Sequence, residues 1–277
     1  MTELYPFQNA DQGRIPDFRT RLLSRQPMIG TFVKIPHHAV AEVLGLSRLD
    51  LICFDAEHAP FDRSALDTVL LASRAAGMPS LVRTARNDAV DILQALDGGA
   101  TGVVIPHVST QANAECAARA CRYLSGVKGS RGYAGSTRAA AYTTRSMSQV
   151  ISTSNDKVAL VAQIEDAEAL DHLDEIASVD GVDCLFVGRA DLTVSLGAST
   201  PNDRRVVEAV RQICAAGKRH ERPVGMFTSD IEEIPHWMTL GASLFLLASD
   251  QHSILTGANL LADQFLRLSS TLAVTTR

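Results

Sequence analysis

The chain has 277 residues, of which 46% are hydrophobic and 21% charged, and its formal net charge is −5. This composition is ordinary for a globular protein and excludes a disordered, collagen-like or disulfide-stapled chain. The excess of acidic residues argues against an extended nucleic-acid-binding surface. No apolar run approaches the roughly 18 residues that span a bilayer, and residues 1–14 lack the apolar core of a signal peptide. We therefore expect a cytoplasmic protein that binds neither nucleic acid nor membrane.

The five cysteines are spread along the chain without a C-x-x-C pair. Cys53 and Cys184 lie in strand-like apolar runs, whereas Cys116, Cys121 and Cys214 lie in helix-like stretches. An odd number of cysteines without metal-ligand spacing indicates reduced, mostly buried thiols.

Short apolar runs alternate with amphipathic stretches along most of the chain. The apolar runs are typical of parallel strands that are covered on both faces. The predicted strands are residues 29–33, 49–54, 80–83, 102–106, 159–164, 184–187, 224–227 and 243–247. The stretches between them have helical periodicity. The predicted helices are residues 62–76, 89–96, 111–124, 166–176, 204–220, 231–240 and 253–268.

Glycines mark the ends of several predicted helices, shortly before the next strand. They are Gly77, Gly98, Gly99, Gly181 and Gly241. Eight strands in eight β/α units predict a (β/α)8 TIM barrel, an α/β fold, in a single domain over residues 26–277. A doubly wound parallel sheet shares the local pattern, but the number of strands favours the barrel.

Two regions depart from the repeat. Residues 1–25 are polar and predict an N-terminal arm or a short capping helix. Residues 125–157 form a long insertion between the fourth and fifth strands, and a connection of this length is usually a functional loop or an interface element. Arg131, Arg138 and Arg145 lie in it with few acidic neighbours. They are expected to meet either the substrate or a neighbouring subunit.

Catalytic groups of such a barrel lie at the carboxyl-terminal ends of the strands. Glu165 follows the fifth strand and Asp191 follows the sixth, so the two carboxylates form a natural pair of oxygen ligands for Mg²⁺ or Mn²⁺. Gln163 lies two residues before Glu165, so both side chains point to the same face of the strand. The alternative is that each carboxylate caps a helix or pairs with an arginine.

Three further residues have two interpretations each. His58 follows the second strand, where an imidazole suits proton transfer, or it is a hydrogen-bonded structural residue. Arg83 ends the third strand and either stabilises an enolate or holds a carboxylate, or it pairs with Asp55 or Glu57. Asp97 lies near the end of a predicted helix, where it either orients the histidine or simply ends the helix.

The rarity of lysine limits the possible mechanisms. The chain has lysines only at positions 34, 128, 157 and 218. A Schiff-base aldolase of this fold often carries its lysine in or just after the sixth strand, and none lies there. Lys34 is the only plausible amine nucleophile, and a surface position or a contact to a substrate carboxylate suits it better.

Six segments occur in an order that resembles the HpcH/HpaI aldolase family. They are FDAEHAPFD (54–62), LVRTARND (81–88), LDGGATGVVIPHV (96–108), GSRG (129–132), VAQIED (161–166) and FVGRADLTVSLG (186–197). The family comprises metal-dependent class II pyruvate aldolases and includes 4-hydroxy-2-oxoheptanedioate aldolase. The resemblance implies a (β/α)8 barrel. It also implies a homohexamer, built as a trimer of dimers that exchange their last helix.

The resemblance also implies roles for individual residues. His58 is implied as the catalytic base, acting through a metal-bound water, with Asp97 raising its basicity. Arg83 is implied as the residue that stabilises the enolate. Glu165 and Asp191 are implied as ligands of a divalent metal ion, which is Mg²⁺, Mn²⁺ or Co²⁺. The substrate-binding contacts to the 2-oxo acid are implied for Gln163, for the backbone at Ala190 and for Arg83. Arg189 departs from the family, which commonly has proline there, and an added cation at this point would either alter substrate preference or face a subunit contact.

The activity implied is reversible cleavage of a 4-hydroxy-2-oxo acid to pyruvate, or a related 2-oxo acid, and an aldehyde through a metal-bound enolate. Such an enzyme is expected in the catabolism of aromatic or sugar-derived acids. The alternative is a related metal-dependent acyl-CoA lyase or an oxaloacetate decarboxylase, and the acidic composition speaks against a basic groove for CoA. A catalytically silent barrel would be expected to lose the candidate residues, all of which are present.

Overall fold

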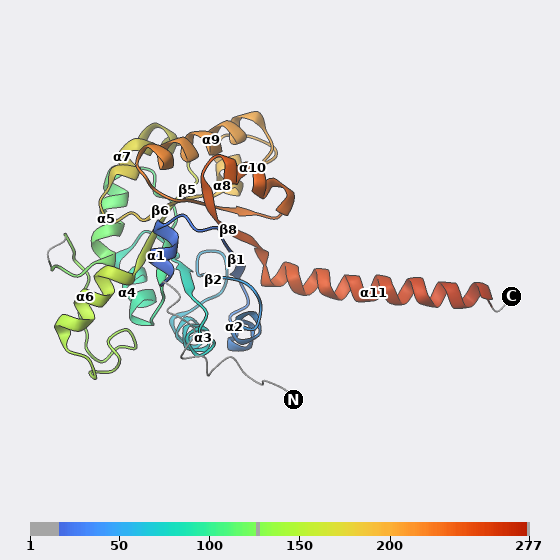
Figure 1. Cartoon of the computed structure of the whole chain (residues 1–277), viewed down its shortest axis with the longest axis horizontal. Helices are drawn as coiled ribbons and strands as arrows, with labels where there is room; N and C mark the ends of the chain where they lie inside the picture. Colours follow the sequence, from blue (N-terminus) through green and yellow to red (C-terminus); the bar gives the residue numbers. More distant parts are fainter. Residues whose placement is uncertain (1–16, 126–127, 276–277) are drawn as a thin grey trace.

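The barrel is the centre of the molecule. The structure is a computed structural model that describes residues 17–125 and 128–275. Eight parallel strands form a closed barrel in chain order, with β8 paired to β1 (Figure 1). The strands are β1 (Met28–Val33), β2 (Leu51–Asp55), β3 (Ser80–Arg83), β4 (Gly102–Ile105), β5 (Ala159–Ile164), β6 (Cys184–Val187), β7 (Val224–Thr228) and β8 (Ala242–Ser249). The predicted single-domain (β/α)8 barrel is confirmed, and each predicted strand overlaps an observed one.

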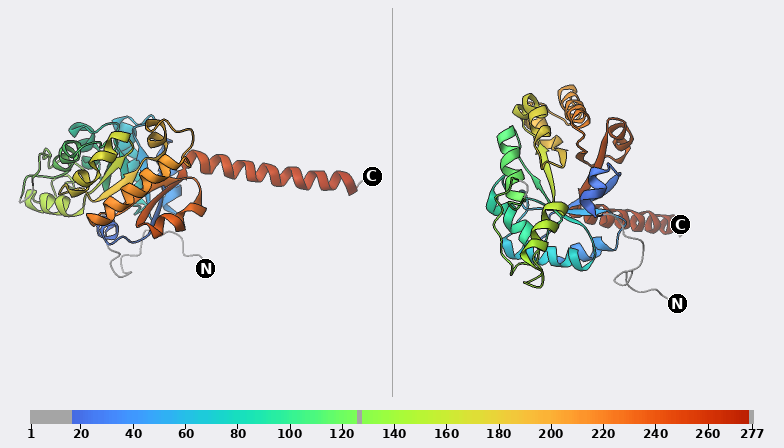
Figure 2. Two further views of the ribbon diagram at one scale, coloured as in Figure 1. Left: turned by 90° about the horizontal axis from the view of Figure 1, so that it is seen from above. Right: turned by 60° about the vertical axis from the view of Figure 1, so that its left-hand side comes forward.

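Helices surround the strands (Figure 2). They are α1 (Phe18–Leu23), α2 (His38–Gly45), α3 (Arg63–Ala75), α4 (Ala89–Asp97), α5 (Gln111–Cys121), α6 (Met147–Lys157), η2 (Ala167–His172), α7 (Leu173–Ser178), α8 (Arg189–Ser195), α9 (Arg204–Arg219), η3 (Ile231–Glu233), α10 (Ile234–Thr239) and α11 (Asp250–Thr275). Every predicted helix overlaps at least one of these elements.

Three helices were not predicted, because they lack a long apolar stripe. α2 has 8 residues and α8 has 7, which is too short for a clear helical period. α6 lies in the predicted insertion, and Val150 is its one buried residue. Its start is set by a capping box, in which Ser146 accepts from the Gln149 backbone and the Gln149 side chain accepts from the Ser146 backbone.

The strand alternation decides which side chains enter the barrel. Along β2, Leu51 and Cys53 belong to the buried cluster inside the barrel, whereas Ile52 and Phe54 pack toward the surrounding helices. Both faces are therefore buried, which is why the strand reads as a continuous apolar run. Asp55 continues the inward series, so the sequence of the strand itself directs this carboxylate into the carboxyl-terminal end of the barrel.

The amino-terminal end of the barrel is closed by α1. Phe18 and Leu22 are buried in the same interior cluster as Met28. Arg19 anchors the helix, because its Nη2 lies 2.8 Å from Oδ1 of the buried Asp183. The capping helix expected within residues 1–25 is thus present, and residues 1–16 of the expected arm lie outside the described residues.

The insertion is fixed to the outside of the barrel by two of its arginines. Arg131 Nη2 lies 2.8 Å from Oδ1 of Asp97, the last residue of α4. Arg138 Nη1 lies 2.8 Å from Oδ1 of Asp67 on α3, and it also donates to the Gly98 carbonyl at 2.7 Å. Both guanidinium groups are buried, so within this chain they hold the insertion in place rather than meet a substrate.

The C-terminal helix α11 leaves the barrel after β8 and extends far from it (Figures 1 and 2). Apolar side chains are exposed along it, namely Ile254, Leu255, Leu260, Leu261, Phe265, Leu266 and Leu268. Among the described residues, no helix combines the length and the apolar character needed to cross a bilayer. Exposed apolar surface of this kind often marks an interaction site. The helix exchange implied by the family resemblance remains a prediction.

Candidate active site

A cavity of about 380 Å³ opens at the carboxyl-terminal ends of the strands. Five of the seven predicted site residues line it, and these are His58, Arg83, Gln163, Ala190 and Asp191. Glu165 lies directly behind the cavity wall, because a Cβ built on Gly188 would be 2.7 Å from its Oε2. The structure therefore brings six of the seven predicted residues to one place.

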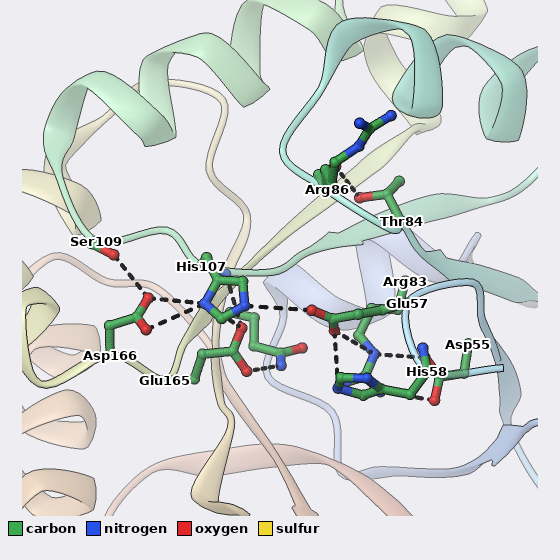
Figure 3. A network of polar contacts seen from close by, with 11 residues as sticks. Asp55, Glu57, His58, Arg83, Thr84, Arg86, His107, Ser109, Glu165 and Asp166 are labelled. Carbon is green, nitrogen blue, oxygen red and sulfur yellow. Dashed lines mark hydrogen bonds and ion pairs between the residues drawn. The ribbon is translucent and has the colours of Figure 1, made fainter. Parts of the chain in front are cut away.

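Arg83 is held by a buried carboxylate. Its Nε donates to Asp55 Oδ1 at 3.0 Å, and its Nη2 lies 2.8 Å from Asp55 Oδ2. Nε also lies 3.3 Å from Oε2 of Glu57, and the guanidinium stacks 4.7 Å from the centre of the Phe32 ring. The pairing of Arg83 with Asp55 and Glu57 is thus present, and the same guanidinium still faces the cavity (Figure 3).

Asp55 is the charge partner that fixes this side of the cavity. It is 0% exposed, and Lys34 Nζ lies 3.1 Å from its Oδ2. Burial opposes its ionisation, but the hydrogen bonds and charge of Arg83, with help from the His58 backbone N–H and Lys34, lower the pKa of Asp55 below its usual value. Asp55 therefore stays ionised and keeps Arg83 in position.

His58 lies at the rim of the cavity. Its backbone N–H donates to Asp55 Oδ1 at 3.1 Å, so the turn after β2 is pinned to the buried carboxylate. The ring is 52% exposed, and its Nε2 lies 3.7 Å from Glu57 Oε2, which is beyond hydrogen-bond distance. This half-exposed imidazole faces the cavity and is accessible to a proton-bearing substrate (Figure 3).

Three carboxylates, Glu57, Glu165 and Asp191, form what we call the carboxylate cluster. Burial raises the pKa of Glu57, and the charges of Asp55 and Asp191 add to the rise against the opposing charges of Arg83 and His107. Burial likewise raises the pKa of Glu165, and the charge of Glu57 contributes. Crowding of this kind is relieved when a cation binds among the carboxylates.

A buried acceptor without a hydrogen bond gives an independent reason to place a cation here. Within residues 17–125 and 128–275, Gln163 Oε1 is buried without a hydrogen-bond partner, and Glu57 Oε2 makes no hydrogen bond beyond its ion-pair contact with Arg83 at 3.3 Å. The amide of Gln163 donates instead to Glu165 Oε2. Oxygen donors of this type are the ligands that Mg²⁺ and Mn²⁺ prefer. The donor set is thus suited to a divalent metal ion.

His107 is a site residue that the sequence reasoning missed. It follows β4, and its ring lies between Glu57, Glu165 and Asp166 (Figure 3). One ligand atom from each of Glu57, His107 and Glu165 lies within 4.8 Å of the others. A search of the residues that follow each strand would have found His107, because it comes two residues after the end of β4.

Asp97 is the one predicted site residue that the structure does not bring to the cavity. It is the last residue of α4, five residues before β4 begins, and helices of this barrel run antiparallel to the strands. It therefore lies toward the amino-terminal end of the barrel, whereas His58 lies at the carboxyl-terminal end. Within this chain Asp97 pairs with Arg131 and lies away from His58. Asp55, three residues before the histidine, accepts a hydrogen bond from its backbone N–H, and Glu57 is the carboxylate beside its ring.

Arg189 is used within the fold. It is buried, its Nη1 donates to Glu233 Oε2, and its Nη2 donates to Asn202 Oδ1 at 3.1 Å. Its guanidinium also lies 5.5 Å from the centre of the Trp237 ring. Glu233 thereby neutralises the charge of Arg189 next to the cavity. These contacts within the chain explain the position of Arg189 without a role in substrate preference or in a subunit contact.

Comparisons with known proteins agree with this geometry. The family model described as HpcH/HpaI aldolase/citrate lyase matches residues 28–256. The chain is 32% identical over 252 residues to a 5-keto-4-deoxy-D-glucarate aldolase of Shigella boydii, covering 90% of this chain and 95% of that protein. It is 33% identical over 237 residues to a hydroxypyruvate/pyruvate aldolase of Paraburkholderia phytofirmans, covering 84% of this chain and 90% of that protein.

A solved structure extends the likeness to the fold. It is an HpcH/HpaI aldolase/citrate lyase family protein from Burkholderia cenocepacia, which is 34% identical with a TM-score of 0.84 and is covered over 98% of its length by 90% of this chain. Sequence, fold and residues at the strand ends therefore agree. The chain belongs to the HpcH/HpaI aldolase/citrate lyase family and is a carbon–carbon lyase.

Proposed function

We propose that the protein is a divalent-metal-dependent aldolase that reversibly cleaves a 4-hydroxy-2-oxo acid into pyruvate, or a related 2-oxo acid, and an aldehyde. One observation carries the proposal. A permanently charged arginine, an exposed histidine and Asp191 of the carboxylate cluster line one cavity at the strand ends, and Glu165 lies directly behind its wall. These are the groups that enolate chemistry needs, namely a cation for the developing charge, a base, and ligands for a metal ion.

Glu165 and Asp191 would hold the metal ion. When bound, the ion would act as a Lewis acid toward the 2-oxo group and carboxylate of the substrate. The crowding of the carboxylate cluster and the buried Gln163 Oε1, which has no hydrogen-bond partner, support this assignment. Mg²⁺, Mn²⁺ and Co²⁺ are the candidate ions.

His58 would move the proton. In the cleavage direction it takes the proton of the C4 hydroxyl group, the C3–C4 bond breaks, and the aldehyde leaves. The electron pair of that bond passes to the 2-oxo acid as an enolate, which is then protonated at C3. Arg83 would stabilise the enolate charge, since its guanidinium is fixed by Asp55 and remains charged at any working pH.

The volume of the cavity and the names of the relatives support a class of substrate. A cavity of about 380 Å³ has room for a small acid of sugar size. One relative acts on 5-keto-4-deoxy-D-glucarate and another on hydroxypyruvate or pyruvate, and both names describe chemistry at an oxo acid. Lys34 lines the cavity beside Asp55 and offers a cation to a second carboxylate of the substrate.

Exchange of the pyruvate methyl protons with D₂O, followed by NMR, tests the proposal without knowledge of the aldehyde. Exchange above the buffer rate is expected with Mg²⁺ or Mn²⁺, and excess EDTA should stop it. Arg83→Lys should slow this exchange. Arg86→Lys is its matched control, because Arg86 lies in the loop after β3 but its side chain is 76% exposed. If folded, metal-loaded protein exchanges no protons, the proposal is wrong, and acyl-CoA thioesters and oxaloacetate become the substrates to test.

A further inference from the structure

We propose that His107 is a third protein ligand of the divalent metal ion, so that the site has one nitrogen donor beside its oxygen donors. This inference rests on the proposed metal-dependent function and makes it more specific. His107 follows β4, between the strand ends that carry Glu57 and Glu165. The three side chains meet in the centre of the polar network of Figure 3.

The distances suit a shared ion. His107 Nε2 lies 3.5 Å from Oε1 of Glu57. Two neighbouring ligand atoms that are each about 2.1 Å from one octahedral ion are about 3.0 Å apart. One ligand atom from each of Glu57, His107 and Glu165 lies within 4.8 Å of the others, and the closest contact of the ring with Glu165 is from Nδ1, 3.6 Å from Oε1. Nε2 and Glu57 are therefore close to the spacing of a common cation, and Glu165 lies beside them.

The orientation of the ring leaves the correct nitrogen available. His107 Nδ1 lies 3.1 and 3.2 Å from the two carboxylate oxygens of Asp166. Ser109 Oγ in turn donates to Asp166 Oδ2 at 2.9 Å, which fixes that carboxylate. An N–H at Nδ1 donated to Asp166 places the lone pair on Nε2, which faces Glu57. Histidines that ligate metals are usually oriented by a carboxylate in this way.

The backbone also directs His107 toward the carboxylates. His107 has φ of 54°, a left-handed conformation that non-glycine residues seldom adopt and that is often retained at functional sites. In this conformation its backbone N–H donates to Glu165 Oε1 at 2.8 Å. The same strained residue thus orients one proposed ligand through its backbone and presents its own ring to the space between the carboxylates.

A nitrogen donor changes which ions the site prefers. Mg²⁺ binds oxygen ligands and tolerates only near-ideal octahedral geometry, whereas imidazole suits transition metals. A site with His107 as ligand should therefore bind Co²⁺ much more tightly than Mg²⁺. Without this histidine, the remaining carboxylates would leave a site with oxygen donors alone.

The test is calorimetric titration of EDTA-stripped protein with Mg²⁺ and with Co²⁺, together with the visible absorption spectrum of the Co²⁺ complex. We expect His107→Gln to weaken Co²⁺ binding at least tenfold and to alter the spectrum, while Mg²⁺ affinity changes less than threefold. Asp166→Asn, which removes only the orienting carboxylate, should weaken Co²⁺ binding about tenfold. His38→Gln is the matched control, because this exposed histidine pairs with Glu42 at 3.6 Å on α2.

Three results would overturn the inference. Unchanged Co²⁺ affinity and spectrum in His107→Gln would remove His107 from the ligands and leave the proposed function standing. Tighter binding of both ions in that variant would identify His107 as a positive partner of the carboxylates instead. If the wild-type protein binds neither ion, the metal-dependent function fails together with this inference.

Discussion

Replacing Asp55 with asparagine removes the buried charge that holds Arg83 and keeps the shape of the side chain. Arg83 is 6% exposed and makes two close contacts to Asp55, at 3.0 and 2.8 Å. Each hydrogen bond to a charged group contributes about 1.5–3 kcal/mol, and loss of one partner of a buried pair costs about 3–5 kcal/mol. Because the introduced amide retains one acceptor oxygen and Glu57 remains 3.3 Å from Arg83, we expect the low end of this range, about 3 kcal/mol.

Urea unfolding in excess EDTA measures this loss without a contribution from bound metal. The transition midpoint of Asp55→Asn should fall while the slope of the free energy with urea is unchanged. Asp174→Asn is the control, because Asp174 pairs with Arg219 at 2.8 Å but is 57% exposed. A surface pair of this kind contributes about 1 kcal/mol or less. If both variants unfold at the same midpoint, the argument that Asp55 stabilises the buried arginine is wrong.

The pH dependence gives the same argument a second test. Burial opposes ionisation of Asp55, but Arg83, the His58 N–H and Lys34 hold its pKa below the usual value. A carboxyl group whose pKa is lowered by folding stabilises the folded state above its unfolded pKa of about 3.9, and this contribution is lost as the pH falls through the folded pKa. The stability difference between wild type and Asp55→Asn should be constant above about pH 5 and should narrow below about pH 4. A constant difference down to about pH 3 would contradict this assignment.

Three further outcomes are expected. Arg83→Lys keeps the charge but loses the planar fork, so pyruvate proton exchange in D₂O should slow at least a hundredfold, and a rate near that of the wild type would refute the enolate role. Glu165→Gln should weaken Mn²⁺ binding at least tenfold in an EPR titration, and unchanged binding would exclude Glu165 as a ligand. Cys116 is exposed, whereas burial raises the pKa of Cys53 and Cys121 to about 12, so a thiol reagent should modify Cys116 first under native conditions, as peptide mapping would show.

The barrel could be predicted because its strands are buried on both faces. A strand such as β5 reads as a continuous apolar run, and the same alternation that buries Val161 inside the barrel brings Gln163 to the cavity. The order of residues along each strand therefore predicts both the barrel and the site residues that lie on the strands themselves. Arg83, at the end of β3, follows the same logic.

The parts that were missed depend on contacts between segments far apart in the chain. The insertion was predicted as a loop, because α6 buries little apolar surface, and Arg131 and Arg138 of the insertion pair with carboxylates on α4 and α3 that lie far away in the sequence. The residues left two roles open for Asp97 and the resemblance assigned it to the site, although its place at the end of α4 puts it toward the opposite end of the barrel. His107 was overlooked although it comes two residues after the end of β4, because its partners Glu57, Glu165 and Asp166 come from the segments after β2 and β5.

Glu57 shows why the two halves of the cavity act together. On one side it lies 3.3 Å from Arg83, and on the other it lies 3.5 Å from His107. Its pKa is raised by burial and by Asp191, so an additional anion next to it is unfavourable. A 2-oxo acid brings such an anion. In the proposed reaction, the substrate carboxylate would approach the carboxylate cluster only when a divalent cation balances the charge. The enolate oxygen, which is the former 2-oxo oxygen, would then lie between that cation and Arg83, so both positive groups would stabilise the same developing charge.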